Sequence, residues 1–199
     1  MTELNDFHFG IRFDHDRVMK TIIKKMNTNY KALLMLCLIT VGFANPLLAQ
    51  EKPLHELHSM MIYNFIKYIQ WPESNVQGEF TIAVIGDDQV YNTLNAWYGG
   101  KVRGNKKFIV KKFNAAEEVT SCEILYVSNE SSNQFNTIKS KLASTSTLLI
   151  TDKDGLAEKG SGINFRRINN KIAFELNQKA IESASLKVSG QLVNMAILI

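Results

Sequence analysis

The chain has 199 residues, of which 45% are hydrophobic and 21% are charged, and its net charge is +4. This length allows one domain or two small ones, with enough apolar residues for one well-buried core. Six basic and four acidic residues fall within the first 49, which leaves a net charge of +2 on residues 50–199. A charge so close to neutral gives no reason to expect a nucleic-acid partner.

The first 49 residues have the pattern of a leader with a secretory signal peptide. Four lysines between positions 20 and 31 precede an apolar run from Ala32 to Ala44, and small residues follow at the expected cleavage point. We expect cleavage after Ala49, with a cut after Ala44 as second choice, and Met26 is an alternative start. An uncleaved membrane anchor is the other interpretation, although the run is shorter than the roughly 20 apolar residues that span a bilayer.

Residues 50–199 are predicted to form a single exported domain. The sequence places Cys37 in the leader and Cys122 alone in the mature part. One cysteine cannot form an internal disulfide, although export would permit one. The stability of the domain must therefore come from its core.

A helix is predicted over residues 54–70, because apolar side chains recur there at helical spacing. The stripe consists of Leu57, Met60, Met61, Asn64, Phe65 and Tyr68. Trp71 and Pro72 end the helix, since a residue before proline is pushed out of the helical region. A large aromatic residue at such a position is typically part of the core.

The most informative stretch runs from Phe80 to Asp88. Its continuous apolar part, Phe80 to Ile85, predicts a buried strand that a glycine and two acids close. Residues 89–97 then have helical spacing, with Val90, Leu94 and Trp97 on one face. Strand, tight turn and helix form the first half of a βαβ unit. We therefore expect the rest of the chain to fold back onto this strand.

Further strands and helices alternate along the remaining chain. Strands are predicted at 108–110, 122–127 and 147–151, and helices at 131–142, from Asn177 onward, and around Leu192, Val193, Ala196 and Ile197. Asn169 and Asn170 join the runs 163–168 and 171–176 into a hairpin. This order predicts an α/β fold, a mainly parallel central sheet flanked by helices (a Rossmann-like sandwich) with a C-terminal antiparallel hairpin.

Two clusters of charged side chains have more than one interpretation. Lys106, Lys107, Lys111 and Lys112 flank the strand at 108–110. They could bind an anionic polymer or lipid head groups, but such lysines more often guard a sheet edge against unwanted pairing. Asp87 and Asp88 end one strand, and Asp152 and Asp154 end another. They could hold Mg²⁺ or a small ligand at the carboxyl edge of the sheet, but helix capping explains all four acids more simply, Asp152 included.

No catalytic constellation is visible in the mature part. It lacks a Gly-x-Ser-x-Gly elbow and a Gly-x-Gly-x-x-Gly fingerprint. His55 and His58 are its only histidines, too few for a zinc site, and Cys122 opens a strand that should be buried, where a thiol is inert. The sequence predicts no enzyme, no metal and no cofactor.

Several of these stretches resemble one family. The segment from Tyr63 to Pro72, with its Tyr-Asn-Phe start and Trp-Pro end, resembles the opening signature of the YfiR-type periplasmic proteins, also described as YfiR/HmsC-related. The blocks 86–88, 100–104 and 122–126 are similar to the next parts of that signature. The most specific similarity lies between residues 148 and 189. The resemblance as a whole covers essentially all of the mature chain.

This resemblance implies a periplasmic α/β domain that is not an enzyme. In such systems the protein restrains the periplasmic sensor region of an inner-membrane diguanylate cyclase, and an outer-membrane lipoprotein sequesters it. Cyclic-di-GMP output and biofilm formation would be the readouts. Relatives act on sensor kinases as well, and a homodimer is possible. Family members usually pair the cysteine at position 122 with another, and Ala83 stands at the partner position here, so the cysteine pair that would carry disulfide-based control is incomplete in this chain.

The resemblance also suggests a partner-binding surface. Its residues would be Trp71, Phe165, Arg166, Phe174 and Glu175, where the family signature is densest, because interfaces favour aromatic residues and arginine. The alternative is that Trp71 and Phe174 are core residues and that Glu175 pairs internally. A second hypothesis for the function is a small-ligand receptor that feeds a sensor kinase and binds through Asp87, Asp88 and Asp152.

Overall fold

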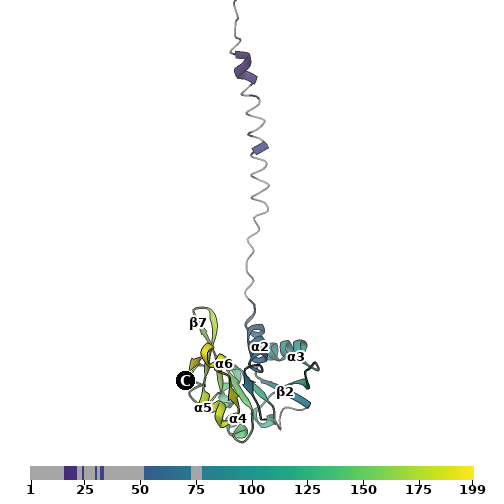
Figure 1. Cartoon of the computed structure of the whole chain (residues 1–199), viewed down its shortest axis with the longest axis vertical. Coiled ribbons are helices and arrows are strands. Elements are labelled where there is room, and N and C mark those ends of the chain that lie inside the picture. Colours follow the sequence, from purple (N-terminus) through teal and green to yellow (C-terminus); the bar gives the residue numbers. More distant parts are fainter. Residues whose placement is uncertain (1–15, 22–23, 25–29, 31, 34–51, 73–77) are drawn as a thin grey trace, which may run out of the picture. The chain divides into compact units, whose positions relative to one another are not determined.

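The computed structural model describes residues 16–21, 24, 30, 32–33, 52–72 and 78–199 (Figure 1). The chain divides into two units, Met1–Gln50 and Glu51–Ile199. Residues 16–21 of the first unit are helical, while Ala44 and Ala49, the two predicted cleavage points, and Met26, the alternative start, lie outside the described residues. Among the helices that the structure describes, none has the length and apolar character needed to cross a membrane.

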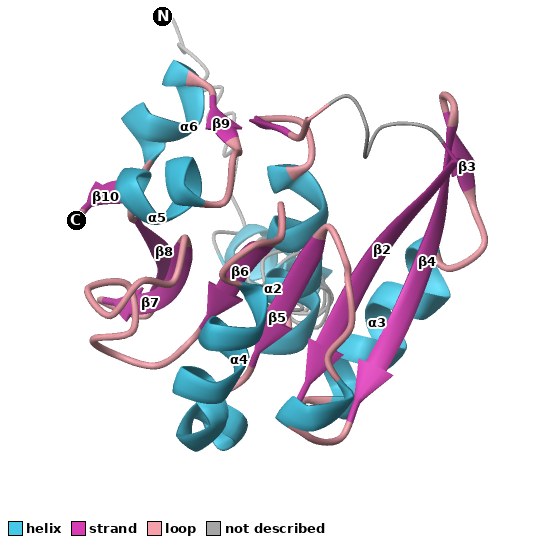
Figure 2. Ribbon diagram, turned by 90° about the horizontal axis from the view of Figure 1, so that it is seen from below, coloured by secondary structure: helices cyan, strands magenta, loops and turns pink. Residues whose placement is uncertain are grey.

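The second unit is built on an eight-stranded sheet in the order β10-β8-β7-β6-β5-β2-β4-β3 (Figure 2). The strands are β2 (Gly78–Ile85), β3 (Val102–Arg103), β4 (Lys106–Phe113), β5 (Ile124–Val127), β6 (Leu148–Thr151), β7 (Ile163–Ile168), β8 (Lys171–Leu176) and β10 (Ile197–Leu198). The five strands β4, β2, β5, β6 and β7 run parallel. Strand β8 is antiparallel to β7, so the predicted fold class is confirmed.

Helices cover both faces of this sheet. They are α2 (Leu54–Phe65), α3 (Asp88–Tyr98), α4 (Phe135–Leu142), α5 (Gln178–Ser183) and α6 (Gly190–Met195), with 3₁₀ turns η2 (Ala116–Glu118) and η3 (Asn129–Gln134). Side chains alternate along β2, so Ile82 and Val84 join the core under α2 and α3, whereas Ala83 and Ile85 join the core under α4. Each fully buried aliphatic or aromatic side chain stabilises the fold by roughly 1.5–3 kcal/mol.

The first helix is shorter than the sequence predicts. It ends at Phe65, and residues 66–68 form a turn held by i→i−3 backbone hydrogen bonds, from Ile66 to Tyr63 for example. Ile69 and Gln70 then form a short strand, β1, that pairs antiparallel with β9 (Lys187–Val188). The prediction was wrong here because β9, more than a hundred residues away in the sequence, forms strand hydrogen bonds with the backbone of residues 69 and 70.

The C-terminus also differs from the prediction. The last helix, α6, ends at Met195, and Ile197 and Leu198 form strand β10, which runs parallel to β8. The amide of Ile199 donates to the carbonyl of Leu176. Apolar residues at this spacing fit a helix or a strand, and the free edge of β8 decides the outcome.

The hairpin of β7 and β8 agrees with the prediction in its strand ranges and in its turn. Asn169 and Asn170 have φ angles of 48° and 61°, the left-handed conformation that a two-residue hairpin turn requires. Only Ile163 and Asn164 of β7 pair with β6. From Phe165 onward the hairpin therefore continues past the carboxyl end of β6, beside the first turns of α2 (Figure 1).

The four lysines of β4 lie at the other end of the sheet. Strand β3 pairs only with Lys106 and Lys107, and no other described strand pairs with the outer edge of β4. Lys111 and Lys112 are exposed along that edge. This position fits their interpretation as a guard against edge-to-edge pairing.

Candidate functional site

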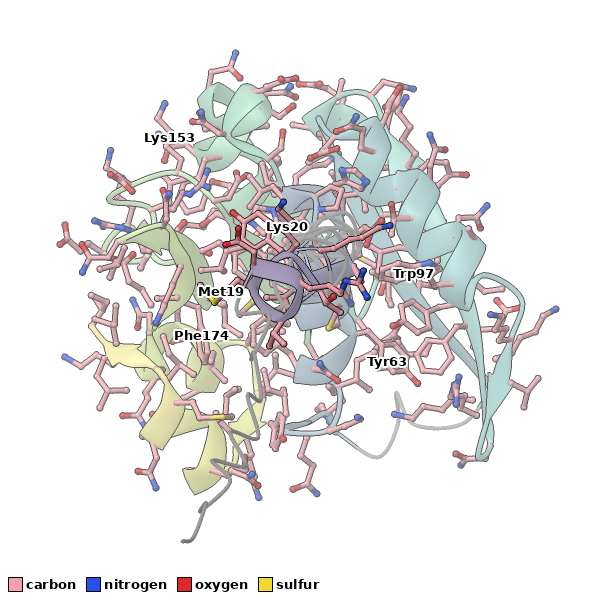
Figure 3. The ribbon with its side chains drawn as sticks, turned by 90° about the horizontal axis from the view of Figure 1, so that it is seen from above. Met19, Lys20, Tyr63, Trp97, Lys153 and Phe174 are labelled. Carbon is pink, nitrogen blue, oxygen red and sulfur yellow. The ribbon has the colours of Figure 1, made fainter. Side chains whose placement is uncertain are left out.

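The aromatic residues of the predicted partner surface lie in the core. Phe165 and Phe174 face each other across the hairpin, and both pack on Phe65 of α2, with ring centroids 6.0 and 5.3 Å away. Phe174 lies on one side of α2, and Tyr63 on the opposite side, beside α3 (Figure 3). The two hairpin phenylalanines therefore attach the hairpin to the domain.

Trp71 is buried in a different place. Its Nε1 donates to the backbone carbonyl of Glu123 at 3.1 Å, and its ring meets Phe80 edge-on at 5.1 Å. The structure therefore does not bring Trp71 together with the hairpin residues. For Trp71 and Phe174 it shows the core positions of the alternative interpretation.

Glu175 and Arg166 belong to a polar network across the base of the hairpin. Glu175 is only 8% exposed, and its two carboxylate oxygens accept hydrogen bonds from Asn164 Nδ2 and Arg166 Nη1, both at 2.8 Å. Thr151 Oγ1 donates to Asn164 Oδ1 at 2.7 Å, which links the network to β6. Arg166 Nε also lies 3.1 Å from Asp154 Oδ1. Glu175 thus pairs internally, and it aligns the hairpin with the sheet.

Of the five predicted partner residues, Arg166 has the most accessible side chain, at 32%. The other four are buried. A direct contact between these five residues and a partner stays a prediction, and the geometry limits it chiefly to the guanidinium of Arg166.

A second polar chain, not foreseen from the sequence, connects α2 to the carboxyl ends of β5 and β6. Tyr126 of β5 donates its hydroxyl proton to Asp152 Oδ2 at 2.8 Å, and His58 Nδ1 lies 3.2 Å from the same hydroxyl. Because the tyrosine proton goes to Asp152, we assign a hydrogen to Nδ1 of His58. The His58 ring also stacks on Phe165, with centroids 4.3 Å apart.

Burial controls the protonation of this chain. Loss of hydration lowers the pKa of His58 to about 4, against a smaller opposing effect of Asp87. Burial likewise raises the pKa of Asp152, although the hydrogen bond from Tyr126 favours its charged form, and burial with the charge of Asp152 raises the pKa of Tyr126. Near neutral pH the His58 ring is therefore uncharged.

The four acids at the strand ends do not share one role. Asp87 caps α3, because its Oδ1 accepts from the amide of Val90 at 2.9 Å. The capping role predicted for Asp152 is wrong, since its Oδ2 accepts from Tyr126 and its Oδ1 accepts from no backbone amide of the turn at residues 154–160. Asp88 pairs with Lys112 at 2.6 Å and Asp154 with Arg166. The capping explanation thus holds for one acid of the four.

The three predicted ligand residues are only partly brought together. Asp87 and Asp88 line a cleft of about 490 Å³ with Gln89, Lys112 and Asn114, and Asp152 does not line it. Among the described residues, no three His, Cys, Asp or Glu side chains are grouped so that they could hold a metal ion. Ligand binding by these acids stays a prediction.

Cys122 is buried and free. Burial, together with the charge of Glu123, raises the pKa of its thiol to about 12. The thiolate, which is the reactive form of cysteine, is therefore almost absent at neutral pH.

A groove beside the hairpin is the main feature that sequence analysis missed. We call it the tip groove; it is lined by Lys52, Leu54, Leu57, Met61, Arg167, Asn170, Lys171 and Ile172, and its volume is about 390 Å³. The helical stripe and the basic hairpin were both visible in the sequence. Nothing in the sequence indicated that they lie against each other.

A family model described as YfiR/HmsC-like matches residues 55–197, from α2 to β10. The chain belongs to this family. The resemblance stated from the sequence is therefore confirmed, and the family is one of periplasmic regulatory domains.

No curated protein matches the chain. A crystal structure of a conserved domain protein from Vibrio cholerae O1 biovar El Tor is 9% identical, with a TM-score of 0.45. The match covers 73% of this chain and 60% of that protein. A likeness of this size carries no argument about function.

Proposed function

We propose that this protein restrains the periplasmic sensor region of an inner-membrane diguanylate cyclase in the cyclic-di-GMP pathway. The family match over residues 55–197 carries the proposal, because the family is consistent with a periplasmic regulator of this kind. The other class of inner-membrane partner is a sensor kinase, and an outer-membrane lipoprotein would sequester the protein. Residues 1–49 would be a leader removed on export, and residues 50–199 the working domain.

The hairpin supports a binding role for the domain. It continues past the carboxyl end of β6, and its base is held by the Glu175 network and by Phe165 and Phe174. An element with a rigid base and an exposed tip can contact a partner without a large loss of conformational entropy. The residues of the hairpin that would contact the partner are Arg166 and the exposed tip residues from Arg167 to Lys171.

Deletion of the gene in the native host tests the regulatory function. We expect cyclic-di-GMP to rise in the deletion strain, and the wild-type protein supplied from a plasmid to reverse the rise. A host in which neither cyclic-di-GMP nor the output of any envelope sensor kinase responds would contradict the proposal.

Crosslinking in living cells tests where the partner binds. A photoreactive amino acid at Ile168, 43% exposed at the hairpin tip, should capture an inner-membrane cyclase or kinase. The matched control is Val102, 66% exposed at the opposite end of the sheet. Equal capture from both positions would remove the hairpin from the interface.

The cleft beside Asp87 and Asp88 supports the second candidate function, a small-ligand receptor that feeds a sensor kinase. The cleft lies at the carboxyl ends of β2 and β4, where α/β proteins commonly bind ligands. Calorimetry with the purified protein against envelope metabolites and divalent ions tests it. A ligand that binds tightly to the wild type and not to Asp88→Asn would favour the receptor function. The absence of binding heat with every compound would contradict it.

A further inference from the structure

We propose that the tip groove binds an acidic segment of the partner, with an apolar side chain of that segment inserted between α2 and the hairpin. This inference rests on the proposed function, because it names the chemistry by which a regulatory partner would be recognised.

The floor of the groove is apolar and comes from two elements. Helix α2 contributes Leu54, Leu57 and Met61, which recur at helical spacing on one face, and β8 contributes Ile172. Leu54 is 47% exposed, so part of this apolar surface is in contact with solvent. A concave apolar surface of about 390 Å³ suits one or two inserted side chains.

The rim of the groove is basic. Its charged residues are Lys52, Arg167 and Lys171, and no acidic residue lines it. Among the described residues, none forms an ion pair with these three side chains. A partner segment with carboxylates on either side of an apolar residue would satisfy both the floor and the rim.

Arg166 and Arg167 show that this charge is not a general property of the hairpin. They are neighbours on β7, so their side chains point to opposite faces. Arg166 lies within ion-pair distance of Glu175 and Asp154, whereas Arg167 lines the tip groove. The domain thus compensates one arginine internally and leaves the other available to a partner.

The shape of the groove favours a protein segment over a membrane surface. An apolar surface that enters a bilayer is typically a protruding helix face, whereas the apolar floor here lies in a hollow between a helix and a hairpin. Apolar anchors that fill such pockets contribute most of the affinity at interfaces, and surrounding charges raise the association rate. Binding to the groove should therefore weaken at high ionic strength.

The direct test uses the purified protein and three short fluorescent peptides. The first carries Asp and Glu around a central Leu-Phe pair, the second replaces the acids by lysines, and the third replaces Leu-Phe by Ser-Ser. We expect only the first to bind. Its affinity should fall about tenfold or more in the double variant Arg167→Glu, Lys171→Glu, because two attractions become repulsions.

The matched control is the double variant Lys101→Glu, Lys107→Glu. Both residues are exposed at the β3–β4 end of the sheet, and the change in net charge is the same. This control should bind the first peptide like the wild type. Equal binding of the first two peptides, or equal losses in the two variants, would overturn the proposal.

Two other occupants are outcomes of the same experiment. Binding of phosphatidylglycerol vesicles that is lost only in the groove variant would assign the basic rim to a membrane. A change in oligomeric state confined to the groove variant would assign it to a second copy of the chain. Either result would overturn the proposal of a partner segment.

The same variants in cells separate this inference from the proposed function. If gene deletion changes no signalling output but the first peptide still binds specifically, the groove stands and the proposed function fails. If deletion raises the output while the groove variant represses like the wild type and fails to bind the peptide, the function stands and the groove is not its partner site.

Discussion

The base and the tip of the β7–β8 hairpin belong to the same two strands but meet opposite environments. At the base, Phe165 and Phe174 pack under α2, and both oxygens of Glu175 are hydrogen-bonded. At the tip, Arg167 to Lys171 are all exposed. Residue type alone does not separate the two regions, because the aromatic and charged residues at the base are as typical of an interface as the charged residues at the tip.

The base of the hairpin serves folding, and its tip is available for binding. The base continues the core of the domain and attaches the hairpin to β6 and α2. The tip adds little to that core, and its charges have no ion-pair partner among the residues that the structure describes. Mutations in the two regions should therefore separate stability from binding.

The largest effect is expected from Phe165→Ala at the base. The substitution removes a ring that packs on His58, Phe65 and Tyr126, and it should lower the free energy of unfolding by about 3–5 kcal/mol. Urea unfolding measures the loss. A decrease below about 1 kcal/mol would show that the base is not part of the core.

A smaller loss is expected from Glu175→Ala. Asn164 and Arg166 would lose their acceptor in a site that is mostly buried, which should cost about 2–3 kcal/mol of stability. Glu175→Gln keeps an acceptor and should cost less. Chemical denaturation of both variants provides the comparison, and equal stability of Glu175→Ala and the wild type would refute a structural role for the network.

The pH dependence of stability should come next in size. Folding lowers the pKa of His58 from 6.5 to about 4, so between these values the unfolded chain binds a proton that the folded domain does not. Stability therefore falls as the pH decreases through this window, by about 1–2 kcal/mol from pH 7 to pH 5. Asp152 acts in the opposite direction, because folding raises its pKa.

Unfolding of His58→Phe at both pH values isolates this contribution. The phenylalanine ring can still stack on Phe165, and it cannot titrate. We expect the decrease in stability between the two pH values to be smaller in the variant than in the wild type. An identical decrease would mean that another group titrates.

The smallest effect on stability is expected from Arg167→Glu at the tip. An exposed residue without an ion pair should change the free energy of unfolding by less than about 0.5 kcal/mol. Thermal unfolding and the signalling output should be measured on the same variant. A loss of stability comparable to that of Glu175→Ala would remove the distinction between base and tip.

The sequence predicted the parts of the fold that depend on local patterns. A continuous apolar run such as Phe80–Ile85 predicts a buried strand from its own residues. The adjacent asparagines at 169 and 170 likewise predict a two-residue hairpin turn. The β1 and β10 segments were predicted as helix, because their strand partners, β9 and β8, are separated from them in the sequence. Pairing across such distances leaves no periodic signal.

The candidate site was harder to predict for the same reason. Arg166, Phe174 and Glu175 stand out by type, but the sequence does not show that the phenylalanine and the glutamate are buried. The link between His58, Tyr126 and Asp152 joins three separate elements, and the tip groove joins α2 to the hairpin. Both depend on the tertiary arrangement.

The pairing of β1 with β9 has a consequence for the order of folding. Ile69 and Val188 are neighbours in this small sheet, so this pairing can form only after almost all of the chain is available. Contacts between distant segments slow folding, because the chain must close a large loop before they form. We therefore expect this small sheet to form late in folding. That delay suits the translocation through the inner membrane that we propose, since secretory translocons accept unfolded chains.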